Sequence, residues 1–91
     1  MLTFEWDENK NQSNQQKYKL SFETARYVFL DPQAKRKPDR MINGEQREYI
    51  VGKVLDVVIA LVVFTERNGN IRIISARRAS KKERILYHGH Q

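Results

Sequence analysis

Residues 65–72, Thr-Glu-Arg-Asn-Gly-Asn-Ile-Arg, contain the clearest folding signal in the chain. Asn68-Gly69 suits the two central positions of a type I′ turn, where both residues need a positive φ. The turn predicts a β-hairpin that pairs Arg67 with Asn70, Glu66 with Ile71, and Thr65 with Arg72. Strict alternation of side chains then predicts two faces. One face holds Thr65, Arg67, Arg72 and Ile74, and the other holds Val62, Phe64, Glu66, Ile71, Ile73 and Ser75.

The sequence on either side of the turn predicts a sheet. Residues 57–64 are all apolar and mostly β-branched, which is typical of a central strand that is covered on both faces. Residues 71–75 are predicted as the returning strand. Residues 45–51 alternate loosely and predict a further strand, after which Gly52 is expected to begin a turn.

The N-terminal region predicts a short strand and a polar helix. Residues 3–6 alternate polar and apolar side chains, and Asp7 can cap a helix over residues 8–17. That segment contains no apolar residue, so the helix is weak by itself. Trp6 and Tyr18 are therefore expected to pin its two ends to the body of the protein.

Two further helices and a loop complete the prediction. Ser21 is expected to cap a short amphipathic helix, whose apolar residues are Phe22, Ala25, Val28 and Phe29. Residues 33–44 have a basic tip and contain Asn-Gly, and they predict an exposed loop. Ser80 and Glu83 have the spacing of a capping box at the start of a C-terminal helix.

This order of elements predicts one α+β domain over residues 1–91. Its small antiparallel sheet would have two N-terminal helices and a C-terminal helix, with the helices on one face. The chain has no cysteine, so disulfides and cysteine-based metal sites are excluded. Its longest apolar run has eight residues, far below the ~20 that a membrane helix needs, which predicts a cytoplasmic protein without a membrane contact.

Charge is concentrated near the C-terminus. The formal net charge is +6, and residues 67–91 contain seven Lys and Arg residues and one Glu. Such a cluster attracts phosphate backbones, although a basic surface can also serve solubility alone.

These segments together resemble the BrnT toxin family. The similarity extends from Phe4-Glu5-Trp6-Asp7 to Tyr87, and its most specific parts are residues 65–67 and 72–79. The resemblance implies a fold similar to RelE toxins, RNA cleavage that stops translation, and a ribbon-helix-helix antitoxin similar to BrnA. The antitoxin would also allow the complex to bind its own operator DNA. The chain departs from the family at Tyr18 and Lys19, where a His-Gly pair is usual, and it lacks a His near Arg40.

The expected activity is that of a metal-independent endoribonuclease without a cofactor. A base must deprotonate the RNA 2′-OH, cations must stabilise the phosphorane, and an acid must protonate the leaving oxygen. The candidate catalytic residues are Glu66 as the base, Arg67, Arg77 and Arg78 as phosphate ligands, and Tyr87 as the acid. The candidate RNA-binding residues are Trp6, Lys10, Arg72, Lys81 and Lys82. No carboxylate and histidine cluster has the spacing of metal ligands.

Most of these candidates have a structural alternative. Arg77 and Arg78 can pair with Glu45 or Glu83, and Glu66 can bridge to Arg67. Tyr87 and Trp6 can be core residues. By alternation from Arg72, Arg78 is expected on the face of Arg67 and Arg77 on the opposite face. Two other functions also fit the sequence: a non-catalytic module that binds RNA or the ribosome, and an interaction protein whose basic face binds an acidic antitoxin segment.

Overall fold

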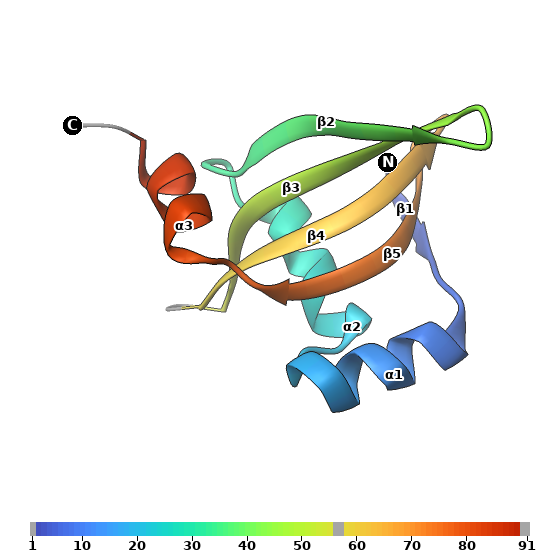
Figure 1. Ribbon diagram of the computed structural model, residues 1–91, viewed down its shortest axis with the longest axis horizontal. Coiled ribbons are helices and arrows are strands. Elements are labelled where there is room, and N and C mark those ends of the chain that lie inside the picture. Colours follow the sequence, from blue (N-terminus) through green and yellow to red (C-terminus); the bar gives the residue numbers. More distant parts are fainter. Residues whose placement is uncertain (1, 56–57, 90–91) are drawn as a thin grey trace.

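A five-stranded sheet in the order β1-β5-β4-β3-β2 organises the computed structural model, which describes residues 2–55 and 58–89 (Figure 1). The strands are β1 Thr3–Glu5, β2 Lys35–Ile42, β3 Glu45–Leu55, β4 Val58–Arg67 and β5 Asn70–Arg78. The predicted α+β class is confirmed, but the prediction of an antiparallel sheet is wrong. β1 lies parallel to β5, and the helices that follow it connect it to β2 at the opposite edge of the sheet. Val57, which the sequence assigned to the central strand, lies outside the described residues.

Strand β2 replaces the loop that was predicted for residues 33–44. Asn43 and Gly44 have φ angles of 51° and 78°, close to the 52° and 84° of Asn68 and Gly69. The chain therefore contains two Asn-Gly hairpins, and only one of them was recognised. Residues 35–41 of β2 are all exposed, so this edge strand lacks the alternation that reveals a strand.

Gly52 lies inside β3, so the turn predicted there is wrong. It pairs with Ala60 in the middle of the β3–β4 ladder. A Cβ atom at Gly52 would lie 2.9 Å from the Ala34 Cβ and 2.9 Å from the Val28 Cγ2. The glycine is therefore needed because neighbouring chain segments approach the strand closely.

Two buried asparagines fix helix α1, Glu8–Tyr18, to its neighbours, Asn14 to the sheet and Asn11 to the chain at Phe22. The Asn14 Nδ2 donates hydrogen bonds to the carbonyl oxygens of Leu20 and Ala76, and its Oδ1 accepts one from the Ala76 amide. The Asn11 Oδ1 accepts a hydrogen bond from the Phe22 amide. The sequence predicted that Trp6 and Tyr18 would pin the ends of this helix, and Trp6 does pack against the core, while the middle of the helix is fixed by polar contacts.

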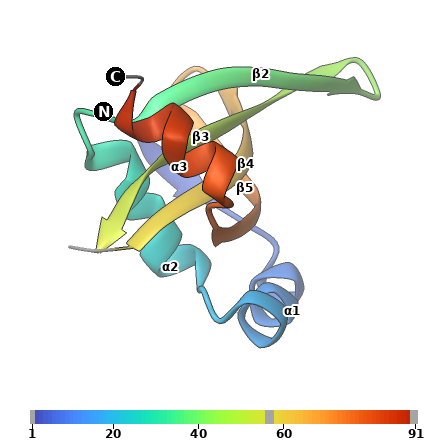
Figure 2. The ribbon, with the colours of Figure 1, turned by 60° about the vertical axis from the view of Figure 1, so that its left-hand side comes forward.

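The other helices lie on both faces of the sheet. Helix α2, Phe22–Ala25, begins at the predicted Ser21 cap, and the 3₁₀ helix η1, Arg26–Leu30, continues it. With α1, they cover the core that contains Phe64 and Ile71. Helix α3, Lys81–His88, has the predicted capping box and lies on the other face of the sheet (Figure 2). Its Tyr87 packs against Val51 and Leu61.

The prediction of helices on one face is therefore wrong. Central strands β3 and β4 carry apolar residues on both sides, and each side needs a cover. Among the described residues, no helix has the length and apolar character that a membrane span requires.

Candidate nucleic-acid interface

Helix α3 covers one end of its face of the sheet, and the other end of this face carries a polar pocket. We call this the hairpin pocket, because it lies beside the β4–β5 turn. It has a volume of about 320 Å³ and is lined by Glu5, Glu45, Thr65, Arg67, Asn70 and Arg72. The predicted hairpin register is confirmed, so that Thr65 lies opposite Arg72 and Arg67 lies opposite Asn70. This register brings the two arginines to one surface.

Each arginine of the hairpin pocket is paired with a carboxylate from another strand. The Arg67 Nε donates to the Glu45 Oε2 at 2.8 Å, and the Arg72 Nη1 donates to the Glu5 Oε2 at 2.8 Å. Hydrogen bonds from Asn70 and Arg72 lower the pKa of Glu5 below its usual value. Because Arg67 is 77% exposed, most of its donors face solvent and can reach a ligand.

A β-bulge determines where Arg77 and Arg78 lie. Phe64 pairs with Ile73, whereas the next pair along the ladder is Val63 with Ser75. Ile74 is therefore an extra residue in β5, and the side-chain alternation reverses after it. Ser75 and Arg77 consequently lie on the face of the hairpin pocket, and Arg78 lies on the opposite face. The faces predicted for these three residues by strict alternation are wrong.

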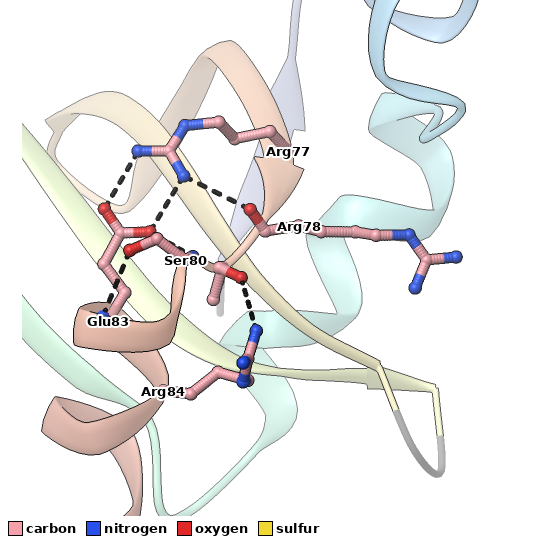
Figure 3. Close-up of polar contacts among 6 residues, drawn as sticks. Arg77, Arg78, Ser80, Glu83 and Arg84 are labelled. Carbon is pink, nitrogen blue, oxygen red and sulfur yellow. Dashed lines mark hydrogen bonds and ion pairs between the residues drawn. The ribbon is translucent and has the colours of Figure 1, made fainter.

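Arg77 is bound by helix α3. Its guanidinium donates to both carboxylate oxygens of Glu83, at 2.8 and 2.9 Å, and the side chain of Arg78 runs in the opposite direction (Figure 3). The hydrogen bonds from Arg77 lower the pKa of Glu83 to about 2 despite its partial burial. The same carboxylate accepts a hydrogen bond from the Ser80 amide. Sequence analysis offered an ion pair with Glu83 as the alternative to a phosphate-binding role for Arg77, and this ion pair is present.

Glu66 lies on the face of α1 and α2, away from the hairpin pocket. Its carboxylate accepts a hydrogen bond from the Arg36 Nη2, and Arg36 also binds both oxygens of Glu48, at 2.7 and 3.0 Å. The Arg36 guanidinium lies 4.8 Å above the centre of the Phe64 ring. Glu66 thus belongs to an ionic cluster that joins β2, β3 and β4, and its partner is Arg36 rather than Arg67.

Tyr87 lies in the core beneath α3. Its hydroxyl donates to the Asp31 Oδ2 at 2.7 Å, and burial together with this hydrogen bond raises the pKa of Tyr87 to about 12. Burial opposes ionisation of Asp31, but hydrogen bonds from the Lys53 amide, Tyr87 and the Gln33 amide outweigh it and lower the pKa of Asp31. This geometry favours the packing alternative for Tyr87.

The remaining RNA-binding candidates are scattered. Trp6 packs against the core and makes an edge contact with Phe22, which fits an anchor for α1. Lys10 is exposed on α1, on the other side of the sheet from the hairpin pocket. Lys81 and Lys82 are exposed on the first turn of α3. Of the original candidates, the structure brings Arg67 and Arg72 together in one pocket.

Sequence analysis missed both carboxylates of the hairpin pocket. Glu45 could have been found from the second Asn-Gly turn, since that hairpin starts β3 at this residue. Glu5 reaches the pocket only because β1 pairs with β5, a contact between residues 67 positions apart. In the described part of the chain, no group of three or more His, Cys, Asp and Glu side chains could hold a metal ion.

Comparisons with known proteins agree with this architecture. Residues 6–83 match a family model described as the ribonuclease toxin BrnT of type II toxin–antitoxin systems. The chain is also similar to the Brucella abortus ribonuclease toxin BrnT, known from a 1.1 Å crystal structure. The TM-score is 0.71 at 26% sequence identity, with 89% of this chain and 100% of that chain covered. Curated protein sequences give no significant match.

Proposed function

The chain belongs to the BrnT family of ribonuclease toxins from type II toxin–antitoxin systems, and on that basis we propose that the hairpin pocket binds and cleaves RNA. The observation that supports this proposal is the convergence of Arg67 and Arg72 in one polar pocket, each beside a carboxylate. A planar guanidinium keeps its charge at all relevant pH values and binds two phosphate oxygens at once. The two arginines would hold the scissile phosphate.

Glu45 is the base that fits this pocket best. It lies beside Arg67 in the pocket, whereas Glu66 lies on the other face and is bound by Arg36. Binding of a phosphate to Arg67 would weaken its ion pair with Glu45. The released carboxylate oxygen could then take the proton from the RNA 2′-OH, which attacks the adjacent phosphorus and displaces the 5′-oxygen of the next nucleotide. The leaving 5′-oxygen would take a proton from solvent water, and Glu45 would later return its proton to solvent, so the products would be a 2′,3′-cyclic phosphate and a 5′-hydroxyl.

We propose that this reaction needs no metal ion. The developing charge on the phosphorane would be balanced by Arg67 and Arg72, which is a task that metal ions perform in other nucleases. RNA cleavage would stop translation in the cytoplasm. The partner would be a ribbon-helix-helix antitoxin similar to BrnA, which would also let the complex bind operator DNA.

Three alanine variants and a synthetic RNA test the site. Arg67→Ala and Arg72→Ala should each reduce turnover by roughly 10²–10³-fold with folding preserved, by analogy with the loss of one donor to an oxyanion. Arg78→Ala is the matched control, since Arg78 lies on the other face of the same sheet. Mass spectrometry should detect a 2′,3′-cyclic phosphate, and a chelator should leave the rate unchanged.

Binding and cleavage are separated by a second measurement. RNA affinity should decrease with ionic strength, with a log–log slope of roughly −0.7 for each phosphate contact. If RNA binds with this slope but stays intact, the protein is a binding module. If Arg67→Ala and Arg72→Ala both cleave at the wild-type rate, the hairpin pocket is not the active site.

A further inference from the structure

A second surface lies at the end of the sheet remote from the hairpin pocket. Two adjoining pockets meet there at Leu55, one of about 270 Å³ and one of about 240 Å³. We call this surface the amphipathic patch and define it by six residues. Its apolar residues are Tyr27, Leu30 and Leu55, and its cations are Lys19, Lys53 and Arg78.

The apolar residues of the amphipathic patch are unusually exposed. Six large hydrophobic side chains are exposed among the described residues, and three of them gather here. Leu30 alone is 75% exposed. Single exposed apolar side chains are common on protein surfaces, but a contiguous group with polar residues around it marks an interaction site.

Among the described residues, the charges around this patch are predominantly positive. Arg78 and Lys19 line one pocket, and Lys53 lines the other. The carboxylate that lines these pockets within the described residues is Asp31, and its oxygens already accept hydrogen bonds from the Lys53 amide, the Gln33 amide and Tyr87. A ligand at the patch would therefore meet cations at the rim and apolar side chains at the centre.

This composition fits a protein better than a nucleic acid. Protein interfaces have an apolar centre and a polar rim, whereas interfaces with nucleic acids are more polar and are dominated by positive charge. Complementary charge would require carboxylates on the partner. The expected ligand is thus an acidic, amphipathic polypeptide segment.

The amphipathic patch is far from the hairpin pocket. Leu55 pairs with Val58 at the start of β4, and Arg67 lies at the end of this ten-residue strand. At about 3.3 Å per residue, the two sites are separated by roughly 30 Å. A segment bound at the patch leaves the hairpin pocket uncovered unless the partner continues along the sheet.

We propose that the amphipathic patch binds the cognate antitoxin. The inference rests on the proposed toxin function, since membership of a type II toxin–antitoxin family implies such a partner. An acidic antitoxin segment places apolar side chains against Tyr27, Leu30 and Leu55 and carboxylates against the three cations. Arg78 accordingly serves antitoxin binding, while the neighbouring Arg77 holds α3.

The test uses the full-length toxin and the protein encoded beside it. Leu30→Glu and Arg78→Glu should each weaken the complex by roughly tenfold or more, because an apolar contact is lost or a favourable charge is reversed. Met41→Glu and Arg40→Glu are matched controls on edge strand β2, where Met41 is 63% exposed, and they should leave the affinity unchanged. Thermal unfolding should show that all four variants are folded. Calorimetric titration measures the affinities.

RNA cleavage by each variant without antitoxin distinguishes this proposal from the nuclease site. Leu30→Glu and Arg78→Glu should cleave RNA at the wild-type rate. Wild-type antitoxin affinity in both variants would overturn the proposal. This holds even if the two substitutions change RNA cleavage, or change the self-association of the toxin as measured by sedimentation. Loss of cleavage in Arg67→Ala and Arg72→Ala with normal antitoxin affinity would support both proposed sites. Normal cleavage in these two variants would refute the hairpin pocket as the nuclease site and would leave the proposal for the amphipathic patch unaffected.

Discussion

Replacement of Glu83 by Gln should destabilise the protein through one interaction, the ion pair with Arg77. Gln keeps a side-chain oxygen for the hydrogen bond from the Ser80 amide, so the capping box can survive while the charge is lost. The carboxylate binds Arg77 through two hydrogen bonds that connect α3 to the end of β5. The substitution therefore measures how much this connection stabilises the fold.

The magnitude follows from the pKa of Glu83. A decrease from 4.5 to about 2 corresponds to an upper bound of roughly 3 kcal/mol. Arg77 and Glu83 are 38% and 22% exposed, so solvent screens the pair and about 1–2 kcal/mol is the expected loss at pH 7. For a domain of this size, the melting temperature should decrease by roughly 5–15 °C.

The dependence on pH gives a sharper signature than the melting temperature. Because the pKa of Glu83 is lower in the folded state, the stabilisation is complete above about pH 4.5 and is lost as the pH falls toward 2. Thermal unfolding by circular dichroism from pH 7 to pH 2 should show that wild type and Glu83→Gln converge in acid. Glu5→Gln is the control, since the exposed pair of Glu5 with Arg72 should contribute little to stability. Parallel curves for wild type and Glu83→Gln across this range would refute the reasoning.

Three further substitutions test one close packing contact, at Gly52, and the hydrogen bonds of two side chains, Tyr87 and Asn14. Gly52→Ala should lower the free energy of unfolding by about 1–3 kcal/mol in urea titrations, because the new methyl group overlaps Ala34 and Val28. Tyr87→Phe should cost about 1 kcal/mol and leave RNA cleavage unchanged, whereas a large loss of turnover in the folded variant would identify Tyr87 as the general acid. Asn14→Ala should cost about 3 kcal/mol or more, since three buried backbone groups lose their partner, and a change below about 1 kcal/mol would contradict this role of Asn14.

Local signals predicted the parts of the fold that local chemistry determines. The Asn68-Gly69 turn, the helix caps at Asp7 and Ser21 and the capping box of Ser80 with Glu83 are all present. Each of these depends on residues within a few positions of one another, so short sequence patterns are sufficient to identify them. The family resemblance was also confirmed over most of the chain.

Contacts between distant segments could not be predicted in this way. The parallel pairing of β1 with β5 places Glu5 beside Arg72, and no local pattern encodes it. The edge strand β2 could not be recognised from the sequence, because its residues from 35 to 41 are all exposed and show no alternation of buried and exposed side chains. Both features contribute to the charge networks of the sheet, since Arg36 on β2 binds Glu66 and Glu5 lines the hairpin pocket. The pairing of Glu66 with Arg36 and of Glu5 with Arg72 was therefore beyond sequence analysis.

The bulge at Ile74 explains how two consecutive arginines can serve different purposes. Arg77 and Arg78 would lie on opposite faces in any strand, but the bulge determines which one shares the face of Arg67. It directs Arg77 to α3, where the Glu83 carboxylate accepts hydrogen bonds from its Nη1 and Nη2, and Arg78 to the pocket with Lys19 on the other face. A sequence comparison that groups the two arginines as one basic motif would combine a residue that stabilises the fold with one that is available to a partner. The structure separates them, and alanine and glutamate substitutions at the two positions should give different phenotypes for this reason.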